Sequence, residues 1–345
     1  MNYILKDENA VYYECGFSCD NVVFLKLGSE AFFVTDSRYD TEAKQYIRDA
    51  EVIITERRDM YPKVRELIQS ANIKELKFNP REWSLDDYSE FTKDNNSVKF
   101  TQVYNLSQEK RIIKSEDELD ILRKASELGA KAFDRFAKFL NENGLGVAEQ
   151  RLHYEAENIF KNSGELGLSF SPILGIMDNA AKCHALPSAE DILSLGDLVL
   201  FDAGVMYKRY CSDRTRTAEF NQNMNFSKVQ SFTNEKHQKI YDVVLKAQEA
   251  GIKKAKAGVK ACEVDIACRE VIENAGYGEL FIHSTGHGVG LDIHELPIIS
   301  NTSETILEEG MVFTVEPGIY FPNEFGVRIE DTLIITNSHA EVIGK

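Results

Sequence analysis

The first hundred residues alternate between apolar patterns of period two and of period 3.6, which predict strands and helices in turn. Strands are predicted at residues 22–27, 31–35, 51–55, 75–78 and 98–103. Helices are predicted at residues 37–49, 61–71 and 85–93. Strands that alternate with helices indicate a small α/β domain. We find no cluster of catalytic residue types in this stretch.

The rest of the chain has longer helical patterns and indicates a second domain. A polar segment, residues 107–114, is predicted to link residues 1–106 to residues 115–345. Ser115 and Glu118 form a capping-box pattern that opens a helix to about residue 140. Further helices are predicted at 149–162, 236–256 and 263–275, and apolar strands at 198–201, 311–315 and 332–336. Residues 221–235 are predicted to be a polar surface insertion.

Composition and charge restrict the possible partners. The chain has 345 residues, which fits two domains of about 150 residues. It carries 40 Lys and Arg against 56 Asp and Glu, a net charge of −16. Because an acidic surface repels phosphate groups, nucleic acid is not expected as a partner. No apolar run reaches the roughly 18 residues that a membrane span needs.

The N-terminal residues and the cysteines predict a cytoplasmic protein. Acidic residues stand where a secretory signal needs a positive charge and then an apolar stretch. The six cysteines form no Cys-x-x-Cys pair and are expected to stay reduced. Zinc fingers and redox-active thiol pairs are therefore not predicted.

Two aspartates stand at the ends of apolar segments. Asp202 lies in Phe-Asp-Ala-Gly after an apolar strand, and Asp213 opens Ser-Asp-Arg-Thr-Arg-Thr. If these two segments pair as a hairpin, the two carboxylates can face each other, and they repel unless a proton or cation lies between them. The alternative is structural, with Asp202 capping a strand end and Asp213 paired with Arg216.

Two glutamates repeat this arrangement near the C-terminus. Glu316 directly follows the strand predicted at 311–315, and Glu330 follows Gly326-Val-Arg-Ile, with a turn at Pro322-Asn323 between them. An unpaired carboxylate beside a buried strand is costly. Both glutamates are therefore expected to have a partner.

Three histidines, His283, His287 and His294, lie between the two acidic pairs, among glycines 286, 288 and 290. A single such histidine could be an ordinary core residue, and the glycines could form an ordinary turn. Together they indicate backbone that is held close to a site. The segment has neither the Gly-Lys-Ser/Thr of a phosphate-binding loop nor the HExxH pattern of a zinc-binding helix.

Two aspartates, two glutamates and one histidine form an oxygen-rich set of candidate metal ligands. This set favours Mn²⁺, Co²⁺ or Fe²⁺, allows Zn²⁺, and disfavours a thiolate-rich structural zinc site. Four carboxylates carry four negative charges, which two divalent ions neutralise and one ion does not. The charge balance therefore favours a dinuclear site.

The order and context of these five residues resemble the metal-binding pattern of the creatinase/methionine-aminopeptidase superfamily. The matching phrases include Ser-Thr-Gly-His-Gly-Val-Gly-Leu-Asp-Ile-His-Glu, Val-Glu-Pro-Gly-Ile-Tyr and Gly-Val-Arg-Ile-Glu-Asp. The resemblance covers residues 115–345 and implies an α/β (α+β) protein with the pita-bread fold. The first domain resembles the N-terminal domain of the Xaa-Pro peptidases, with Val34-Thr-Asp-Ser-Arg-Tyr39 as its best local match.

The resemblance implies a metal-binding role for each of the five residues. Asp213 and Glu330 would bridge two divalent ions, of which Mn²⁺ is the first expectation. Asp202 would complete the shell of one ion, and His287 and Glu316 that of the other. A water or hydroxide between the ions would be the nucleophile, and Glu316 would accept its proton.

The resemblance also implies roles in substrate binding. His283 and His294 would contact the scissile carbonyl and stabilise the tetrahedral intermediate. His184 would line the proline side of the pocket, although Ala-Lys-Cys precedes it here, where the family often has Ala-Leu-Pro. Tyr320 and Arg328 would orient the substrate or support the ligands.

The leading hypothesis is an Xaa-Pro aminopeptidase that cleaves peptides with proline in the second position. A Xaa-Pro dipeptidase of the same mechanism is the alternative. A metal-free interaction module and a creatinase-like hydrolase are disfavoured because all five ligands are present. A methionine aminopeptidase is disfavoured by the additional first domain. A homodimer is possible, since members of this superfamily commonly form one.

Substrate length depends on recognition of the carboxylate of a terminal proline. A dipeptidase must bind this carboxylate, and arginine is its usual partner. In several prolidases an arginine follows the His-Glu-x-Pro phrase, whereas here Ile298 follows Pro297. Arg38 in the first domain is the other candidate. The missing arginine favours tripeptides and longer substrates.

Overall fold

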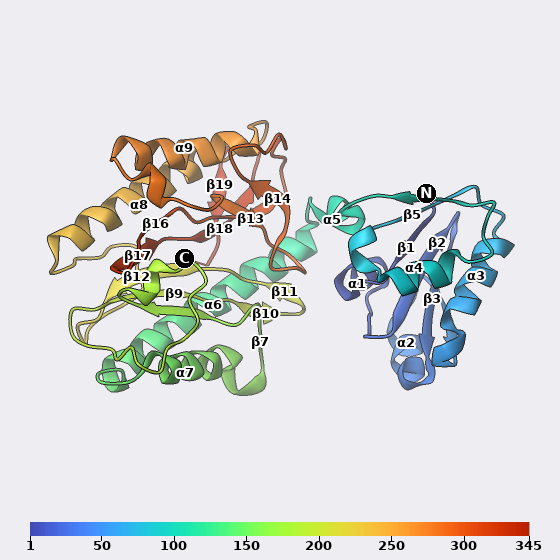
Figure 1. Ribbon diagram of the computed structural model, residues 1–345, viewed down its shortest axis with the longest axis horizontal. Coiled ribbons are helices and arrows are strands. Elements are labelled where there is room, and N and C mark those ends of the chain that lie inside the picture. Colours follow the sequence, from blue (N-terminus) through green and yellow to red (C-terminus); the bar gives the residue numbers. More distant parts are fainter. Residues whose placement is uncertain (345) are drawn as a thin grey trace. The chain divides into compact units, whose positions relative to one another are not determined.

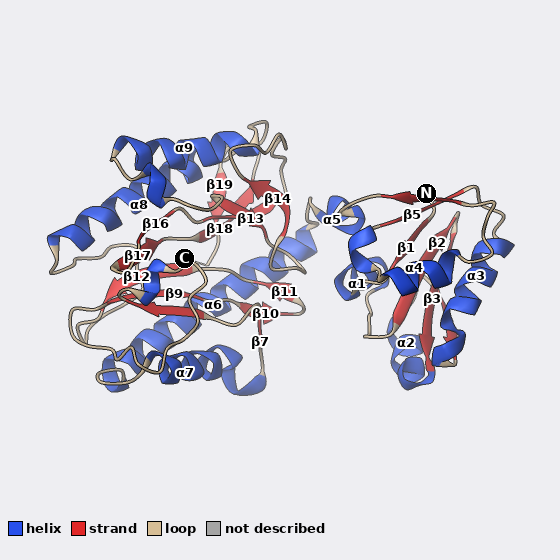
Figure 2. Cartoon of the chain, viewed as in Figure 1, coloured by secondary structure: helices blue, strands red, loops and turns tan. Residues whose placement is uncertain are grey.

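The computed structural model describes residues 1–344 of the chain (Figure 1). The chain separates into two compact units, residues 1–111 and residues 112 to the end of the described chain. Both units are built from helices and strands (Figure 2), which confirms the predicted mixed α/β class. No helix among the described residues is long and apolar enough to cross a membrane.

The first unit is built on one six-stranded sheet in the order β4-β3-β2-β1-β5-β6. Its strands are β1 (Tyr3–Leu5), β2 (Val22–Leu27), β3 (Glu30–Asp36), β4 (Glu51–Thr55), β5 (Glu75–Phe78) and β6 (Lys99–Gln102). Its helices are α1 (Glu8–Cys15), α2 (Asp40–Tyr46), α3 (Met60–Ser70), α4 (Leu85–Thr92) and α5 (Leu106–Arg111). Alternate strand residues point to opposite faces, so Phe24 joins one core and Leu25 the other.

The sequence pattern did not predict strand β1 or helix α1 of this unit, and it assigned most of helix α5 to the linker. Strand β1 is too short to show an alternating pattern, and α1 is opened by the Asp7 side chain, which accepts from Ala10 N. Part of the predicted linker is helix α5, whose Leu106 is buried in the core of the first unit. The remaining strands and helices lie within a few residues of their predicted bounds.

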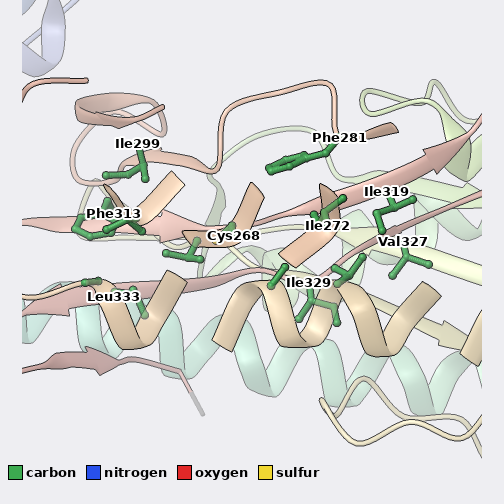
Figure 3. Packing of buried hydrophobic residues seen from close by; sticks show 14 of the residues in the cluster. Cys268, Ile272, Phe281, Ile299, Phe313, Ile319, Val327, Ile329 and Leu333 are labelled. Atoms are coloured by element: carbon green, nitrogen blue, oxygen red, sulfur yellow. The ribbon is translucent and has the colours of Figure 1, made fainter. Parts of the chain in front are cut away.

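The second unit has two halves, each a pair of helices packed on antiparallel strands. In one half, α6 (Glu116–Asn143) and α7 (Glu149–Lys161) cover β8 (Ile173–Ile176), β9 (Leu198–Asp202) and β12 (Thr215–Glu219). In the other half, α8 (Glu235–Lys254) and α9 (Ala261–Asn274) cover β15 (Val312–Val315) and β18 (Asp331–Ile335). Figure 3 shows this second core, to which α9 contributes Cys268 and Ile272 and the sheet contributes Phe313 and Leu333.

The smaller strands of the second unit complete its sheets. They are β7 (Gly167–Leu168), β10 (Val205–Tyr207), β11 (Tyr210–Cys211), β13 (Gly286–Gly288), β14 (Glu295–Ile299), β16 (Gly318–Phe321), β17 (Phe325–Arg328) and β19 (Ala340–Val342). The sheet of the second half has the order β14-β13-β15-β18-β19. The hairpin predicted around Pro322-Asn323 is confirmed, because β16 pairs antiparallel with β17.

The segment 221–235 is not the purely polar insertion that its sequence suggested. Met224, Phe226 and Phe232 are buried, and the Phe226 ring lies 5.6 Å from that of Phe201 in the core under α6. Polar residues dominate the segment, and its few apolar residues gave no periodic signal. The burial of Met224, Phe226 and Phe232 fixes this connection between β12 and α8 onto the body of the unit.

Candidate metal centre and substrate cavity

The four candidate carboxylates lie at the ends of neighbouring strands in the second unit. Asp202 ends β9 and is opposite Thr215 of β12 in the antiparallel register. Asp213 lies two residues before β12, Glu316 directly follows β15, and Glu330 directly precedes β18. Strand ends from both halves of the unit therefore supply acids to one place. Both predicted pairings of strands are found, although β10 and β11 are inserted between β9 and β12.

Three of the predicted ligands form a cluster that could hold a metal ion. One ligand atom each from Asp213, His287 and Glu330 lies within 4.8 Å of the others. The Nε2 atom of His287 is 3.6 Å from Asp213 Oδ2 and 3.3 Å from Glu316 Oε1. The Nδ1 atom of His287 is 3.1 Å from the Gly288 carbonyl oxygen. Because a carbonyl only accepts, the proton is on Nδ1, and Nε2 has its lone pair available for a metal.

Unpartnered oxygens in this cluster fit the binding of cations. Asp202 Oδ1, Asp213 Oδ1 and Glu330 Oε1 are buried and have no hydrogen-bond partner. Buried polar atoms are normally paired, so three orphan carboxylate oxygens in one cluster need an explanation. Metal ions would supply it, since carboxylate oxygens and an imidazole are a suitable donor set for Mn²⁺, Fe²⁺, Co²⁺ or Zn²⁺.

Burial and mutual repulsion perturb the acids of the cluster. Burial, followed by the charges of neighbouring carboxylates, raises the pKa of Asp213 and of Glu330 well above the usual range. Burial raises the pKa of Glu316 to about 7, although the nearby Arg328 guanidinium opposes this. Without cations, the cluster would therefore hold protons near neutral pH, since close carboxylates cannot all stay ionised.

Two threonines and one arginine hold these ligands in place, and sequence reasoning missed the threonines. Thr215 Oγ1 donates to Glu330 Oε2 at 2.6 Å and accepts from Arg328 Nε at 3.0 Å. Thr314 Oγ1 donates to Glu316 Oε1 at 3.0 Å and accepts from the His287 amide at 3.1 Å. A threonine in a strand gives no signal of such a role, because threonine is common in strands and the sequence does not show which group its hydroxyl contacts.

Arg328 is buried beneath the cluster and is occupied by protein partners. Its Nη2 donates to Asp202 Oδ2 at 2.6 Å, and its Nη1 donates to Tyr320 Oη at 2.9 Å. The side chain is 3% exposed. Arg328 therefore supports Asp202 and Tyr320.

The alternative pairing of Asp213 with Arg216 is wrong, because Arg216 donates to Asp331 Oδ1 at 2.6 Å.

The glycines near His287 are needed for close approach of the backbone. A Cβ atom at Gly286 would lie 2.0 Å from the Thr314 carbonyl oxygen, and one at Gly288 would lie 2.2 Å from the Leu296 carbonyl oxygen. Neither position has room for a side chain. This close packing places His287 between β14 and β15, which supports the prediction of backbone held close to a site over an ordinary turn.

A cavity of about 700 Å³ opens above the cluster. Its floor includes Asp202, Asp213, His287, Glu316 and Glu330. Its walls include His184, His283 and His294 with the apolar residues Phe170, Leu186 and Ile298. The structure thus brings the five predicted ligands and the three further histidines to one cavity. Tyr320 does not line it, because it lies behind His283.

The histidines of the cavity differ in what their ring nitrogens contact. His283 Nδ1 is 2.7 Å from the Ser284 carbonyl oxygen, and its Nε2 is 2.9 Å from Tyr320 Oη. Tyr320 therefore donates to His283 while it accepts from Arg328. His294 has no hydrogen-bond partner among the described residues, and its ring packs against that of His287 with centroids 4.3 Å apart. Burial lowers the pKa of both His294 and His283, that of His283 to about 4, so both rings are neutral.

An ion pair on α9 holds the backbone around His283, and sequence reasoning missed it as well. Arg269 donates to the carbonyl oxygens of Phe281 and His283 at 3.1 and 2.9 Å. Its partner Asp265, which is fully buried, accepts from the Thr285 amide at 3.0 Å. The spacing of Asp265 and Arg269 is that of an ordinary helical ion pair, so the sequence gave no reason to single it out.

Comparison with known proteins gives the same assignment as the geometry. Residues 120–337 match the model of metallopeptidase family M24, and residues 2–113 match the creatinase/prolidase N-terminal domain. The chain belongs to metallopeptidase family M24, and its fold is the pita-bread fold.

Several relatives act on bonds to proline according to their names. The Xaa-Pro dipeptidase of Pyrococcus furiosus is 40% identical over 255 residues, which cover 74% of this chain and 69% of the relative. A solved structure of a Xaa-Pro dipeptidase from Bacillus anthracis matches with a TM-score of 0.89 and 34% identity, covering 100% of this chain and 92% of that one. An X-Pro aminopeptidase from Thermotoga maritima matches with a TM-score of 0.87 and 29% identity, covering 100% and 95%.

The raised pKa values predict that divalent metal binding depends on pH. Glu316 holds a proton below about pH 7 when no metal is bound, and this proton must leave before the carboxylate binds a cation. We expect the affinity for Mn²⁺ to fall as the pH is lowered from roughly 8 to 6. For each proton that the metal displaces, the fall should be about tenfold per pH unit. Calorimetry in buffers of different ionisation enthalpy measures the released protons directly. An affinity that is constant over this range, without proton release, would contradict the prediction.

Proposed function

We propose that this metallopeptidase removes an N-terminal residue that precedes proline, using two divalent ions. The observation that carries the proposal is the cavity itself, whose floor is the carboxylate and histidine cluster and whose walls carry three further histidines. The names of the relatives support the choice of a bond to proline. Most aminopeptidases handle such bonds poorly because proline lacks an amide N–H and its ring restricts the backbone.

Two ions fit the ligand set better than one. Asp213 and Glu330 lie centrally in the cluster, and each has one oxygen without a protein partner. We assign these two residues as bridges, Asp202 to one ion, and His287 with Glu316 to the other. When bound, the ions would lower the pKa of the attacking water and polarise the scissile carbonyl. Mn²⁺ is the first expectation.

Glu316 is the residue that we assign as the proton acceptor. Its carboxylate lies in the floor of the cavity beside the other candidate ligands, where it can accept the proton of an attacking water. Thr314 holds one of its oxygens by a hydrogen bond of 3.0 Å. The side chain is thereby fixed in orientation during the proton transfer.

His294 is assigned to the developing oxyanion, because its ring faces the cavity without a protein partner and the neutral ring has one N–H to donate. His283 faces the same cavity, but Tyr320 occupies its Nε2. Its contact with a substrate carbonyl would require exchange of that bond. His184 is an exposed residue of the cavity wall and is assigned to the proline side of the cavity.

The lining of the cavity supports substrates longer than a dipeptide. Among the described residues that line it, Arg328 is the only arginine or lysine, and its donors are already used by Asp202, Tyr320 and Thr215. The free carboxylate of a dipeptide would find no available arginine or lysine among the described lining residues. A tripeptide has a neutral amide at the same position. The names of the dipeptidase relatives instead favour dipeptides as substrates. The two substrate lengths therefore have to be compared directly.

Metal content tests the dinuclear assignment. The purified chain, loaded with Mn²⁺ and freed of excess metal, should hold about two ions by elemental analysis. Asp213→Asn or Glu330→Gln should lose both ions and activity, because each residue is assigned as a bridge. Glu324→Gln, at an exposed position of the β16–β17 turn, is the control and should keep both. One tightly held ion with full activity in Asp213→Asn would disprove the dinuclear assignment.

Replacement of His294 separates chemistry from metal binding. His294→Ala should lower kcat by about 10²–10³ while the metal content stays unchanged, since the ring is assigned to the transition state. His184→Ala should mainly raise KM and weaken discrimination between Ala-Pro-Ala and Ala-Ala-Ala. If His294→Ala lost its metal, the residue would be a ligand and the assignment would be wrong.

Substrate length is tested by comparing kcat/KM on Ala-Pro and on Ala-Pro-Ala. We expect the tripeptide to be preferred by about tenfold, because a dipeptide carboxylate would be left without a charged partner. Ala-Ala-Ala serves as the control for proline specificity and should be cleaved far more slowly than Ala-Pro-Ala. A tenfold or greater preference for the dipeptide would make the protein a dipeptidase.

A further inference from the structure

Glu149 is a fully buried carboxylate that the proposed chemistry does not use. It is the first residue of α7 and is 0% exposed. No ion pair of the described residues includes it, yet its oxygens accept three hydrogen bonds. The Ile176 amide donates at 2.7 Å, the Ser188 amide donates at 2.9 Å, and the Asn179 side chain also donates. Burial raises the pKa of Glu149, whereas these donors and the N-terminal end of a helix favour its charged form.

Two of the three donors lie at the start of one segment and the third lies at its end. Ile176 ends β8, and Ser188 closes the connection that follows it. The same connection supplies Cys183, His184, Ala185, Leu186 and Pro187 to the wall of the cavity. Glu149 thus joins the two ends of the segment 177–188, which we call the wall segment.

Asn179 extends this anchor to the wall itself. Its Nδ2 donates both to Glu149 and to the Leu186 carbonyl oxygen, the latter at 3.0 Å, and its Oδ1 accepts from Lys182 at 2.8 Å. Leu186 is 83% exposed, so packing of its side chain does not fix this part of the segment. Ala180 and Cys183 pack against Leu200 and Tyr320, whereas the two ends of the segment and Leu186 are held by the hydrogen bonds that start from Glu149 and Asn179.

We propose that Glu149, acting through Asn179, is a positioning residue that sets substrate affinity and proline discrimination by fixing the wall segment. Its link to proline rests on the proposed function, whereas its link to the wall segment does not. The metal ligands are on other elements, so a change at Glu149 leaves them in place. A loosened wall weakens binding of substrate more than it slows the chemical step.

Glu149→Gln is the main variant, with Glu157→Gln as its matched control. Glutamine keeps the shape of the side chain but replaces one acceptor by a donor, so a buried amide loses its partner. Glu157 is on the same helix and pairs at 3.4 Å with Lys161 at the surface. For Glu149→Gln we expect KM for Ala-Pro-Ala to rise about tenfold or more, with kcat changed by less than about threefold and metal content unchanged. Discrimination against Ala-Ala-Ala should weaken in parallel.

Limited trypsin digestion gives a readout that does not depend on peptidase activity. Lys182 lies within the wall segment and is exposed. Cleavage between residues 182 and 183, followed by mass spectrometry on the folded protein, should be faster by about tenfold in Glu149→Gln than in the wild type or in Glu157→Gln. If the wild type fails to cleave Xaa-Pro peptides, the proposed function is wrong. The digestion then still tests whether Glu149 fixes the wall segment.

Asn179→Ala is the second variant, in case Glu149→Gln unfolds. It removes the bond to Leu186 while the two backbone amides still reach Glu149, so it should show the same rise in KM and the same cleavage at residue 182. Unchanged cleavage and unchanged KM in a folded Glu149→Gln would overturn the proposal. So would equal losses of kcat and kcat/KM in both variants together with faster cleavage at all sites, since that pattern marks a purely structural role.

Discussion

Four carboxylates are buried together in the second unit, and most of the surrounding structure serves to make this possible. Among the residues that the structure describes, Arg328 is the only buried cation in contact with them, through Asp202. Three of their oxygens are left without any protein partner. Such a concentration of charge is strongly unfavourable in a low-dielectric interior. It is tolerable in a folded protein only when protons or metal ions occupy the cluster, so metal binding and the local stability of the strand ends depend on each other.

Three buried carboxylates outside the cluster hold the segments that carry the histidines of the cavity: Asp265, Glu295 and Glu149. Asp265 binds the Thr285 amide near His283. Glu295 pairs with Lys114 at 2.6 Å, both side chains being 1% exposed, directly beside His294. Glu149 binds both ends of the segment that carries His184. The unit thus places the three further histidines of the cavity on irregular segments that buried acids bind, while the candidate metal ligands lie in strands or within two residues of a strand end.

The sequence indicated the residues that meet in the cavity more readily than it indicated some elements of the fold, for a physical reason. Asp202, Glu316 and Glu330 could be found because each stands beside an apolar strand, where a charge is anomalous. The roles of Thr215 and Thr314 could not be predicted, because they follow from hydrogen bonds that only the folded structure shows. Strand β1, helix α5 and the buried phenylalanines of segment 221–235 are too short or too isolated to give a periodic signal, and tertiary packing alone determines them.

The charges of the complete site explain why Arg328 and neutral histidines occur together. Two divalent ions would bring four positive charges and Arg328 a fifth, against the four carboxylates. Burial lowers the pKa of His283, His287 and His294, so the rings add nothing. With two ions bound, the site would carry one excess positive charge, which a single negative charge on a reacting oxygen would balance. Protonated histidines would raise this excess and would bind anions indiscriminately, whereas neutral rings can still donate a hydrogen bond to the oxyanion as it forms.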